Sequence, residues 1–151
     1  MGLPIMGPAM KYEQPGVAIG EHAFDAGPRV LVLEDDPSFR AVVFELLADE
    51  GFEVVSCESY AALREAARDH AAPVVVADFW GSSHAQLSEC EREQITNLAT
   101  EVPTILLTGR AWAWQVHARD LGLVCILTKP LVLDELLAQV RRGISLRSAS
   151  E

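Results

Sequence analysis

The sequence predicts an α/β fold, with a doubly wound sheet of five parallel strands covered by helices on both faces. Short apolar runs alternate five times with amphipathic segments between residues 28 and 147. The runs lack a polar residue at every second position, which is typical of strands buried on both faces of a parallel sheet. The segments between them carry apolar residues at helical spacing, as repeated strand–helix units require.

The first half of this region supplies three strands and two helices. We expect strands at 29–33, 52–56 and 73–78, the last of them apolar until Asp78 closes it. Apolar residues at helical spacing from Phe39 onward predict a helix that Gly51 ends. Ser59 is expected to cap the second helix through its hydroxyl group.

The second half continues the same alternation. We expect a weaker amphipathic helix at 86–99, a strand at 103–108, a helix at 111–121, a strand at 123–127 and a last helix at 133–146. These elements predict a single domain over residues 28–147. Residues 1–27 have no hydrophobic period and several prolines, so they are interpreted as an N-terminal extension, and 148–151 as a C-terminal tail.

Composition excludes several classes of function. The formal net charge is −10, which argues against nucleic acid as the main partner because phosphate binding needs a concentrated basic face. The three cysteines form no CxxC pair, as expected of a reducing compartment. No run of about 18–20 apolar residues is present to cross a membrane. A cytoplasmic protein without a membrane partner is therefore expected.

Polar side chains gather where the predicted strands end. Glu34, Asp35 and Asp36 follow the first strand, and Asp78 closes the third. The fourth strand ends in Thr108, and the fifth is followed by Lys129. In an open parallel sheet the carboxyl ends of the strands meet at one edge, which is where binding sites form.

This set of side chains suits a hard divalent cation. Carboxylates that share a pocket repel one another and need either a proton or a cation. Oxygen ligands without imidazole or thiolate favour Mg²⁺, with Mn²⁺ as the alternative, over zinc. Such an ion keeps open positions for phosphate oxygens, so the pattern indicates phosphoryl chemistry.

Four motifs together resemble the receiver domains of two-component response regulators. They read VLVLEDDPSFR, VVVADFW, TILLTGRA and ILTKP, stand in the family's order and spacing, and extend over about residues 28–146. The resemblance implies a flavodoxin-like fold and a phosphoacceptor that catalyses its own phosphorylation and dephosphorylation without being a conventional enzyme. It also implies a histidine kinase or a histidine phosphotransfer protein as the donor.

The resemblance also implies a role for each site residue. Asp78 corresponds to the phosphoacceptor. Asp35 corresponds to a direct metal ligand, with Glu34 acting mainly through water, and the backbone carbonyl of Trp80 supplies a further ligand. Asp36 is expected to face solvent at the helix start.

The remaining positions belong to the switch. Thr108 corresponds to the switch hydroxyl and Lys129 to the cation that meets the phosphoryl oxygens. The family usually has an aromatic residue three positions before this lysine, and here that position is Ile126. The rotation of a ring on phosphorylation is therefore not available, which puts the mode of signalling in question.

Two further departures from the family pattern involve tryptophans. The bulk of Trp80 is expected to slow hydrolysis of the phosphoaspartate, or else only to pack on the surface loop. Trp112 and Trp114 lie in the expected fourth helix, where they indicate either a docking or dimer surface or packing in the core.

The sequence leaves three hypotheses about the function. The first is a single-domain response regulator that signals through a downstream protein. This hypothesis allows a homodimer through the face formed by helix 4, strand 5 and helix 5. The second is a receiver-like interaction module that acts independently of phosphorylation. The third is an aspartyl phosphohydrolase of the haloacid dehalogenase type, which would need an Asp two residues after the nucleophile, where Trp80 stands.

Overall fold

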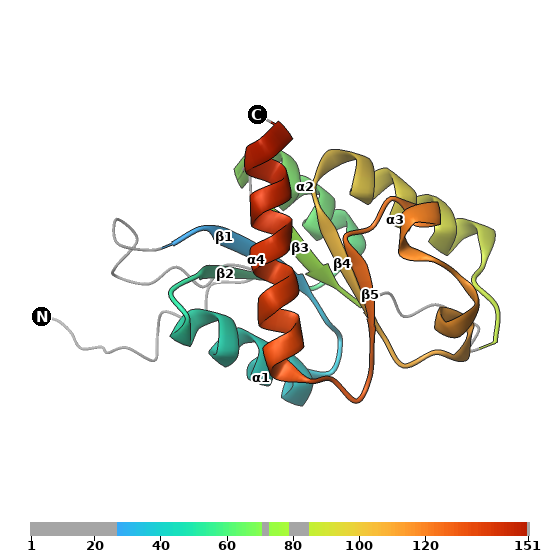
Figure 1. Cartoon of the computed structure of the whole chain (residues 1–151), viewed down its shortest axis with the longest axis horizontal. Coiled ribbons are helices and arrows are strands. Elements are labelled where there is room, and N and C mark those ends of the chain that lie inside the picture. Colours follow the sequence, from blue (N-terminus) through green and yellow to red (C-terminus); the bar gives the residue numbers. More distant parts are fainter. Residues whose placement is uncertain (1–26, 71–72, 79–84, 151) are drawn as a thin grey trace, which may run out of the picture.

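The sheet has five parallel strands in the order β2-β1-β3-β4-β5 (Figure 1). A computed structural model of the chain describes residues 27–70, 73–78 and 85–150. The strands are β1 (Arg29–Leu33), β2 (Glu53–Cys57), β3 (Val74–Ala77), β4 (Thr104–Thr108) and β5 (Cys125–Thr128). The predicted class, a doubly wound parallel α/β fold, is confirmed.

Helices cover both faces of the sheet. They are α1 (Pro37–Asp49), α2 (Tyr60–His70), α3 (Glu89–Glu101) and α4 (Leu133–Ser150), with two short 3₁₀ helices, η4 (Ala111–Gln115) and η5 (Ala118–Leu121). Helices α1 and α4 pack on one face, and α2, α3 and the two 3₁₀ helices on the other (Figure 1). In the described part of the chain no helix is both long and apolar enough to cross a membrane.

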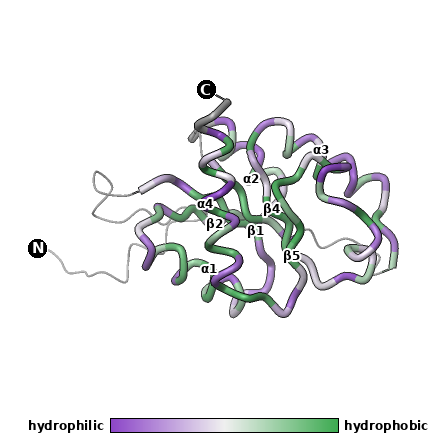
Figure 2. The backbone as a smooth tube through the Cα atoms, in the orientation of Figure 1, coloured by the Kyte–Doolittle hydropathy of each residue, from purple (hydrophilic) through white to green (hydrophobic). Residues whose placement is uncertain are grey.

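Each strand contributes side chains to two apolar layers. Along β1, Val30 and Val32 join the layer under α1 and α4, whereas Leu31 and Leu33 join the layer under α2 and α3. This follows from the two-residue period of a strand, whose successive side chains point to opposite faces. Figure 2 shows the strands as an apolar centre surrounded by more polar helices. The continuous apolar runs in the sequence are explained by this burial on both faces.

The predicted fourth helix at 111–121 is wrong. Val116 and His117 are extended, with φ/ψ of −123°/151° and −103°/140°, and they separate η4 from η5. Both short helices pack apolar side chains into the core, among them Trp112, Ala113 and Leu121. The burial of these apolar side chains outweighs the tendency of the segment to form one continuous helix. The helix propensity of β-branched Val116 is low, so this residue does little to resist the break.

Other boundaries differ by a few residues. Helix α3 begins at Glu89 because Ser88 caps it, accepting a hydrogen bond from Glu91 N–H at 3.1 Å. Helix α4 runs to Ser150, beyond the expected end at 146 and into the segment interpreted as a tail. The expected N-terminal extension lies, apart from Gly27, outside the described residues.

Candidate functional site

Four strands deliver polar side chains to the carboxyl edge of the sheet, as predicted. Glu34 and Asp35 directly follow β1, and Asp78 directly follows β3. The Asp78 backbone N–H donates to Leu33 O at 2.8 Å, so the ladder between these strands continues up to the site. Lys129 directly follows β5, and its backbone N–H donates to Thr108 O at 2.9 Å at the end of β4.

The three carboxylates form one cluster. One oxygen from each of Glu34, Asp35 and Asp78 lies within 4.8 Å of the other two. Glu34 and Asp78 are buried, with 1% and 8% of their surface exposed, whereas Asp35 is exposed. The structure therefore brings together the acidic residues that the sequence singled out, with one side of the cluster open to solvent.

The ammonium group of Lys129 lies against two of these carboxylates. Its Nζ atom donates to Asp78 Oδ2 at 2.7 Å and to Glu34 Oε1 at 3.1 Å. The stem of Lys129 passes Gly109, where an added Cβ would lie 3.8 Å from Lys129 Cβ. Lys129 is thereby set at the centre of the cluster, although it is 95 residues from Glu34 in the chain.

Burial and the close contacts shift the ionisation of the cluster. Burial raises the pKa of Asp78 in spite of the Lys129 hydrogen bond, and the nearby charge of Asp35 raises it further. Burial likewise raises the pKa of Glu34. Burial lowers the pKa of Lys129, but the hydrogen bonds and charges of Asp78 and Glu34 together outweigh this, so that its pKa is raised.

The charges of the cluster fit a divalent cation. Three ionised carboxylates face one ammonium group, which leaves an excess of two negative charges in the cluster. The pKa values of Glu34 and Asp78 are raised chiefly by burial, and further by the charge of Asp78 on Glu34 and of Asp35 on Asp78, in spite of Lys129. Carboxylate oxygens alone favour a hard cation such as Mg²⁺ or Mn²⁺.

Asp36 has a structural role, as predicted for an exposed residue at the helix start. It is the N-cap of α1, and its Oδ1 accepts hydrogen bonds from Ser38 N–H at 3.0 Å and Phe39 N–H at 3.4 Å. Its own backbone N–H donates to Glu34 Oε2 at 3.1 Å. The third acid of the run thus fixes the start of α1 and the orientation of Glu34.

Two residues near the cluster were missed by the sequence analysis. Phe39, in the first turn of α1, places its ring 4.5 Å from Lys129 Nζ, measured to the ring centroid. Arg110 forms an ion pair with Glu91 of α3, and its positive charge acts to lower the pKa of Asp78. Its backbone N–H donates to Thr108 Oγ1 at 3.0 Å. Both residues lie within motifs that the sequence analysis quoted, VLVLEDDPSFR and TILLTGRA, but the resemblance gave neither of them a role.

Comparison with known families agrees with this geometry. The sequence profile of the response regulator receiver domain matches residues 30–141. This chain belongs to the response-regulator receiver family. The match confirms the family that the four sequence motifs indicated.

Curated relatives share the receiver region. The transcriptional regulatory protein DltR of Streptococcus agalactiae serotype III (strain NEM316) is 32% identical over 114 residues, which cover 75% of this chain and 50% of DltR. The phosphate regulon transcriptional regulatory protein PhoB of Escherichia coli (strain K12) is 26% identical over 117 residues, with the same two shares of 75% and 50%. The chain spans about half the length of these relatives.

Solved structures share the fold. The signal receiver domain of a modulated diguanylate cyclase from Desulfovibrio desulfuricans G20 has a TM-score of 0.65 at 22% identity, over 82% of this chain and 98% of that one. The chemotaxis response regulator CheY4 of Vibrio cholerae has a TM-score of 0.62 at 20% identity, over 77% of this chain and 98% of that one. The flavodoxin-like receiver fold is therefore confirmed.

The receiver departs from the family pattern at positions 112, 114 and 126. Ile126 pairs with Leu106 of β4 and packs against the layer under α2 and α3. Trp112 lies in that layer with 2% of its surface exposed, whereas Trp114 is 80% exposed. Of the two interpretations, core packing holds for Trp112 only. Trp80 and its carbonyl group lie outside the described residues.

The structure also differs from the homodimer surface that the sequence analysis expected. That surface included an α-helix at 111–121, and this part of the expectation is wrong because the segment forms two 3₁₀ helices. Of the three elements that were expected to form that surface, β5 and the last helix, α4, have the expected secondary structure.

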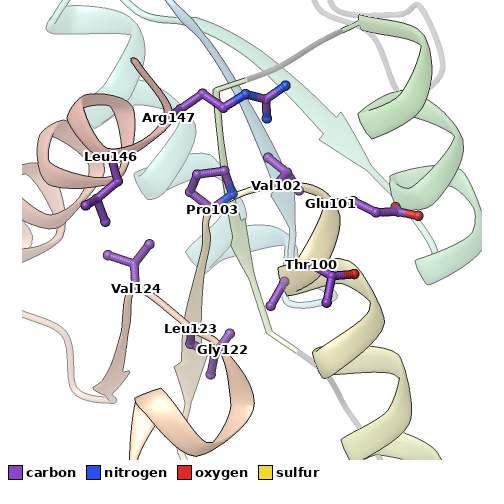
Figure 3. Close-up of a pocket in the computed structure, with 10 residues that line it drawn as sticks. Thr100, Glu101, Val102, Pro103, Gly122, Leu123, Val124, Leu146 and Arg147 are labelled. Carbon is purple, nitrogen blue, oxygen red and sulfur yellow. The ribbon is translucent and has the colours of Figure 1, made fainter. Parts of the chain in front are cut away.

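A pocket of about 370 Å³ lies at the opposite edge of the sheet (Figure 3). Its lining comes from the end of α3, the residues before β4 and β5 and the end of α4, and includes Thr100, Pro103, Val124 and Leu146. These residues carry none of the carboxylate cluster. The candidate site at the carboxyl edge is therefore separate from this pocket.

Proposed function

We propose that this receiver accepts a phosphoryl group on Asp78 from a phosphohistidine of a histidine kinase or a histidine phosphotransfer protein. One observation carries the proposal. The Asp78 carboxylate lies 2.7 Å from the Lys129 ammonium group and within 4.8 Å of two further carboxylates at the carboxyl edge of the sheet. This arrangement supports the proposal that Asp78 is the nucleophile, Lys129 the cation and the carboxylates the metal ligands of one half-open site.

The three carboxylates are proposed to hold Mg²⁺, with Mn²⁺ as the substitute. Asp35 and Asp78 provide direct oxygen ligands, Glu34 acts mainly through water, and the Trp80 carbonyl group remains a predicted further ligand. When bound, the ion supplies positive charge that offsets the charge of the attacking carboxylate and of the phosphoryl oxygens.

The chain's own residues account for the transfer. A carboxylate oxygen of Asp78 attacks phosphorus, an O–P bond forms, and the N–P bond of the phosphohistidine breaks. The imidazole leaves with the bonding electron pair and takes up a proton. Lys129, already a donor to Asp78 Oδ2, is placed to donate to the phosphoryl oxygens. Removing one such preorganised donor costs roughly 10²–10³ in rate.

Thr108 is proposed as the switch hydroxyl. Its Oγ1 accepts the N–H of Arg110 at 3.0 Å, and a hydroxyl that accepts one bond can still donate its proton. The phosphoryl group adds a charge of roughly −1.5 to −2, which attracts the hydroxyl and the Lys129 ammonium group. Because Ile126 has no ring to rotate, this receiver signals without the aromatic step.

The direct output partner is proposed to be a protein in the cytoplasm. The net charge of −10 disfavours binding to a nucleic acid. Action as a single-domain regulator stays a proposal, since the chain spans about half the length of its curated relatives.

A second function is favoured by one specific residue. Ile126 at the switch position suits an interaction module whose state does not depend on phosphate. The carboxylate cluster, Lys129 and Thr108 weigh against this alternative, because such a module would not need five polar side chains assembled at one edge.

Intact-mass spectrometry tests the proposal. The full chain is incubated with acetyl phosphate and Mg²⁺, and we expect one added phosphoryl group that a chelator prevents. Asp78→Asn should show no adduct. Asp36→Asn is the matched control, because it neutralises an acid of the same run outside the cluster, and it should be phosphorylated like the wild type. No adduct on the wild type, even with phosphorylated kinases, would favour the phosphate-independent module.

A further inference from the structure

The ring of Phe39 faces the ammonium group of Lys129. The two are 4.5 Å apart, measured from Nζ to the ring centroid. A cation this close to the face of an aromatic ring is attracted by the negative charge of that face. Phe39 reaches Lys129 from the first turn of α1, whereas Lys129 arrives from the end of β5.

Phe39 is itself held in place. Its backbone N–H donates to the N-cap residue Asp36 at 3.4 Å, which fixes the first turn of the helix. Its side chain is half-buried and packs against the apolar layer under α1 and α4. The ring is therefore a fixed surface beside the cluster rather than a side chain free to move with Lys129.

A fixed neighbouring surface limits the movement of the Lys129 side chain. A lysine stem is long and flexible, and 26% of this side chain is exposed. Its two polar contacts, with Asp78 and Glu34, are to the carboxylates that the proposed reaction would occupy. The Phe39 ring makes no bond to a metal or a phosphoryl group, so its attraction for the ammonium group persists when the carboxylates take other partners.

We infer that Phe39 is a positioning residue, whose ring holds the Lys129 ammonium group over Asp78 and thereby speeds phosphoryl transfer. The inference rests on the proposed function for its effect on rate. The contact between ring and ammonium group does not rest on it, so the two can be tested apart.

NMR spectroscopy tests the contact. The chain has only two lysines, Lys11 and Lys129, so full-length protein labelled with ¹³C at lysine Cε gives two signals. Lys129→Met assigns them. We expect the Lys129 Hε signal to be displaced upfield by the ring current and to return to its ordinary position in Phe39→Leu. An unchanged Lys129 signal in Phe39→Leu overturns the inference whether or not the protein is phosphorylated.

Rates with acetyl phosphate and Mg²⁺ test the effect on transfer. Phenylalanine analogues with one, two and three ring fluorines at position 39 keep the shape of the ring and reduce the negative charge of its face. We expect the rate to fall stepwise along this series and to be about 3- to 10-fold lower in Phe39→Leu, as a contact of roughly 1 kcal/mol predicts.

Phe44→Leu is the matched control. Phe44 lies on the same helix and packs against the same apolar layer, so its truncation reproduces the loss of packing without the contact to Lys129. Equal rates across the fluorinated series, or equal losses in Phe39→Leu and Phe44→Leu, overturn the inference and leave the proposed function standing. If the wild type takes up no phosphoryl group, the proposed function fails, and the NMR comparison alone decides whether the ring holds the ammonium group.

Discussion

The guanidinium group of Arg110 forms a buried ion pair with the carboxylate of Glu91. The side chains are 13% and 7% exposed. Arg110 stands two residues after the switch threonine, and Glu91 lies in the first turn of α3, where its backbone N–H donates to the cap Ser88. This pair connects the segment that follows β4 to the start of α3.

Glu91→Gln should destabilise the protein. It removes the negative charge of Glu91 from its ion pair with the largely buried guanidinium group, and breaking such a pair from one side costs roughly 3 kcal/mol of unfolding free energy. Urea denaturation measures the loss. Glu101→Gln on the same helix is the control, because its pair with Arg64 is more exposed, at 35% and 19%, and surface pairs contribute at most about 1 kcal/mol. Equal losses in the two variants would show that burial of the Arg110 pair has no special effect.

Asp78→Asn should stabilise the metal-free protein at neutral pH. Burial raises the pKa of Asp78, so the folded protein keeps a proton there at pH values where the unfolded chain has lost it. Ionised Asp78 therefore lowers the free energy of unfolding, and this penalty is complete above the raised pKa and absent below about pH 4, the ordinary value.

Denaturation by urea in a chelator, at several pH values, checks this prediction. The advantage of Asp78→Asn over the wild type should shrink as the pH falls through the range in which Asp78 takes up its proton. Asp36→Asn, which also neutralises an acid of this run and keeps an equally good N-cap residue, is the comparison variant. A wild type more stable than Asp78→Asn at pH 7 without metal would contradict the sign.

Gly143→Ala should destabilise the packing of α4 on the sheet. A Cβ at position 143 would lie 2.8 Å from Val74 Cγ2 of β3. Overpacking of this kind costs about 1–3 kcal/mol, against a gain of up to about 1 kcal/mol in helix propensity. Thermal unfolding of the four proteins in a cycle with Val74→Ala tests the cause. The cost of Gly143→Ala should disappear in the Val74→Ala background, and a cost that persists there would point away from this contact.

Cys90 should react first with alkylating reagents. Burial raises the pKa of the Cys57 and Cys125 thiols to about 11 in each case, so little thiolate is present at pH 8. Cys90 is exposed in the first turn of α3. Mass spectrometry of the native protein after brief exposure to iodoacetamide should show one modification, absent in Cys90→Ser, and three after denaturation. Rapid modification of Cys57 in the native state would count against the buried placement.

Much of the fold and most of the site could be predicted from local pattern. The continuous apolar runs indicate strands buried on both faces, and the position of Asp78 and Thr108 at the ends of such runs is enough to place them at one edge. The replacement of the expected fourth helix by two 3₁₀ helices could not be predicted from the spacing. Trp112 and Ala113 pack in the core, and Val116 and His117 are extended between the two short helices. Spacing along the chain carries no information about that packing.

The sequence by itself determined the parallel α/β class and the gathering of acidic residues at the carboxyl edge, because the apolar runs and their side-chain period fix which segments are buried strands and where those strands end. The tertiary structure alone decided which side chains support that cluster. Phe39 meets Lys129 across 90 residues, and Arg110 meets Glu91 across 19, through elements that only packing brings together. Contacts of this kind depend on the relative placement of helices and strands, and a periodicity along the chain does not encode it.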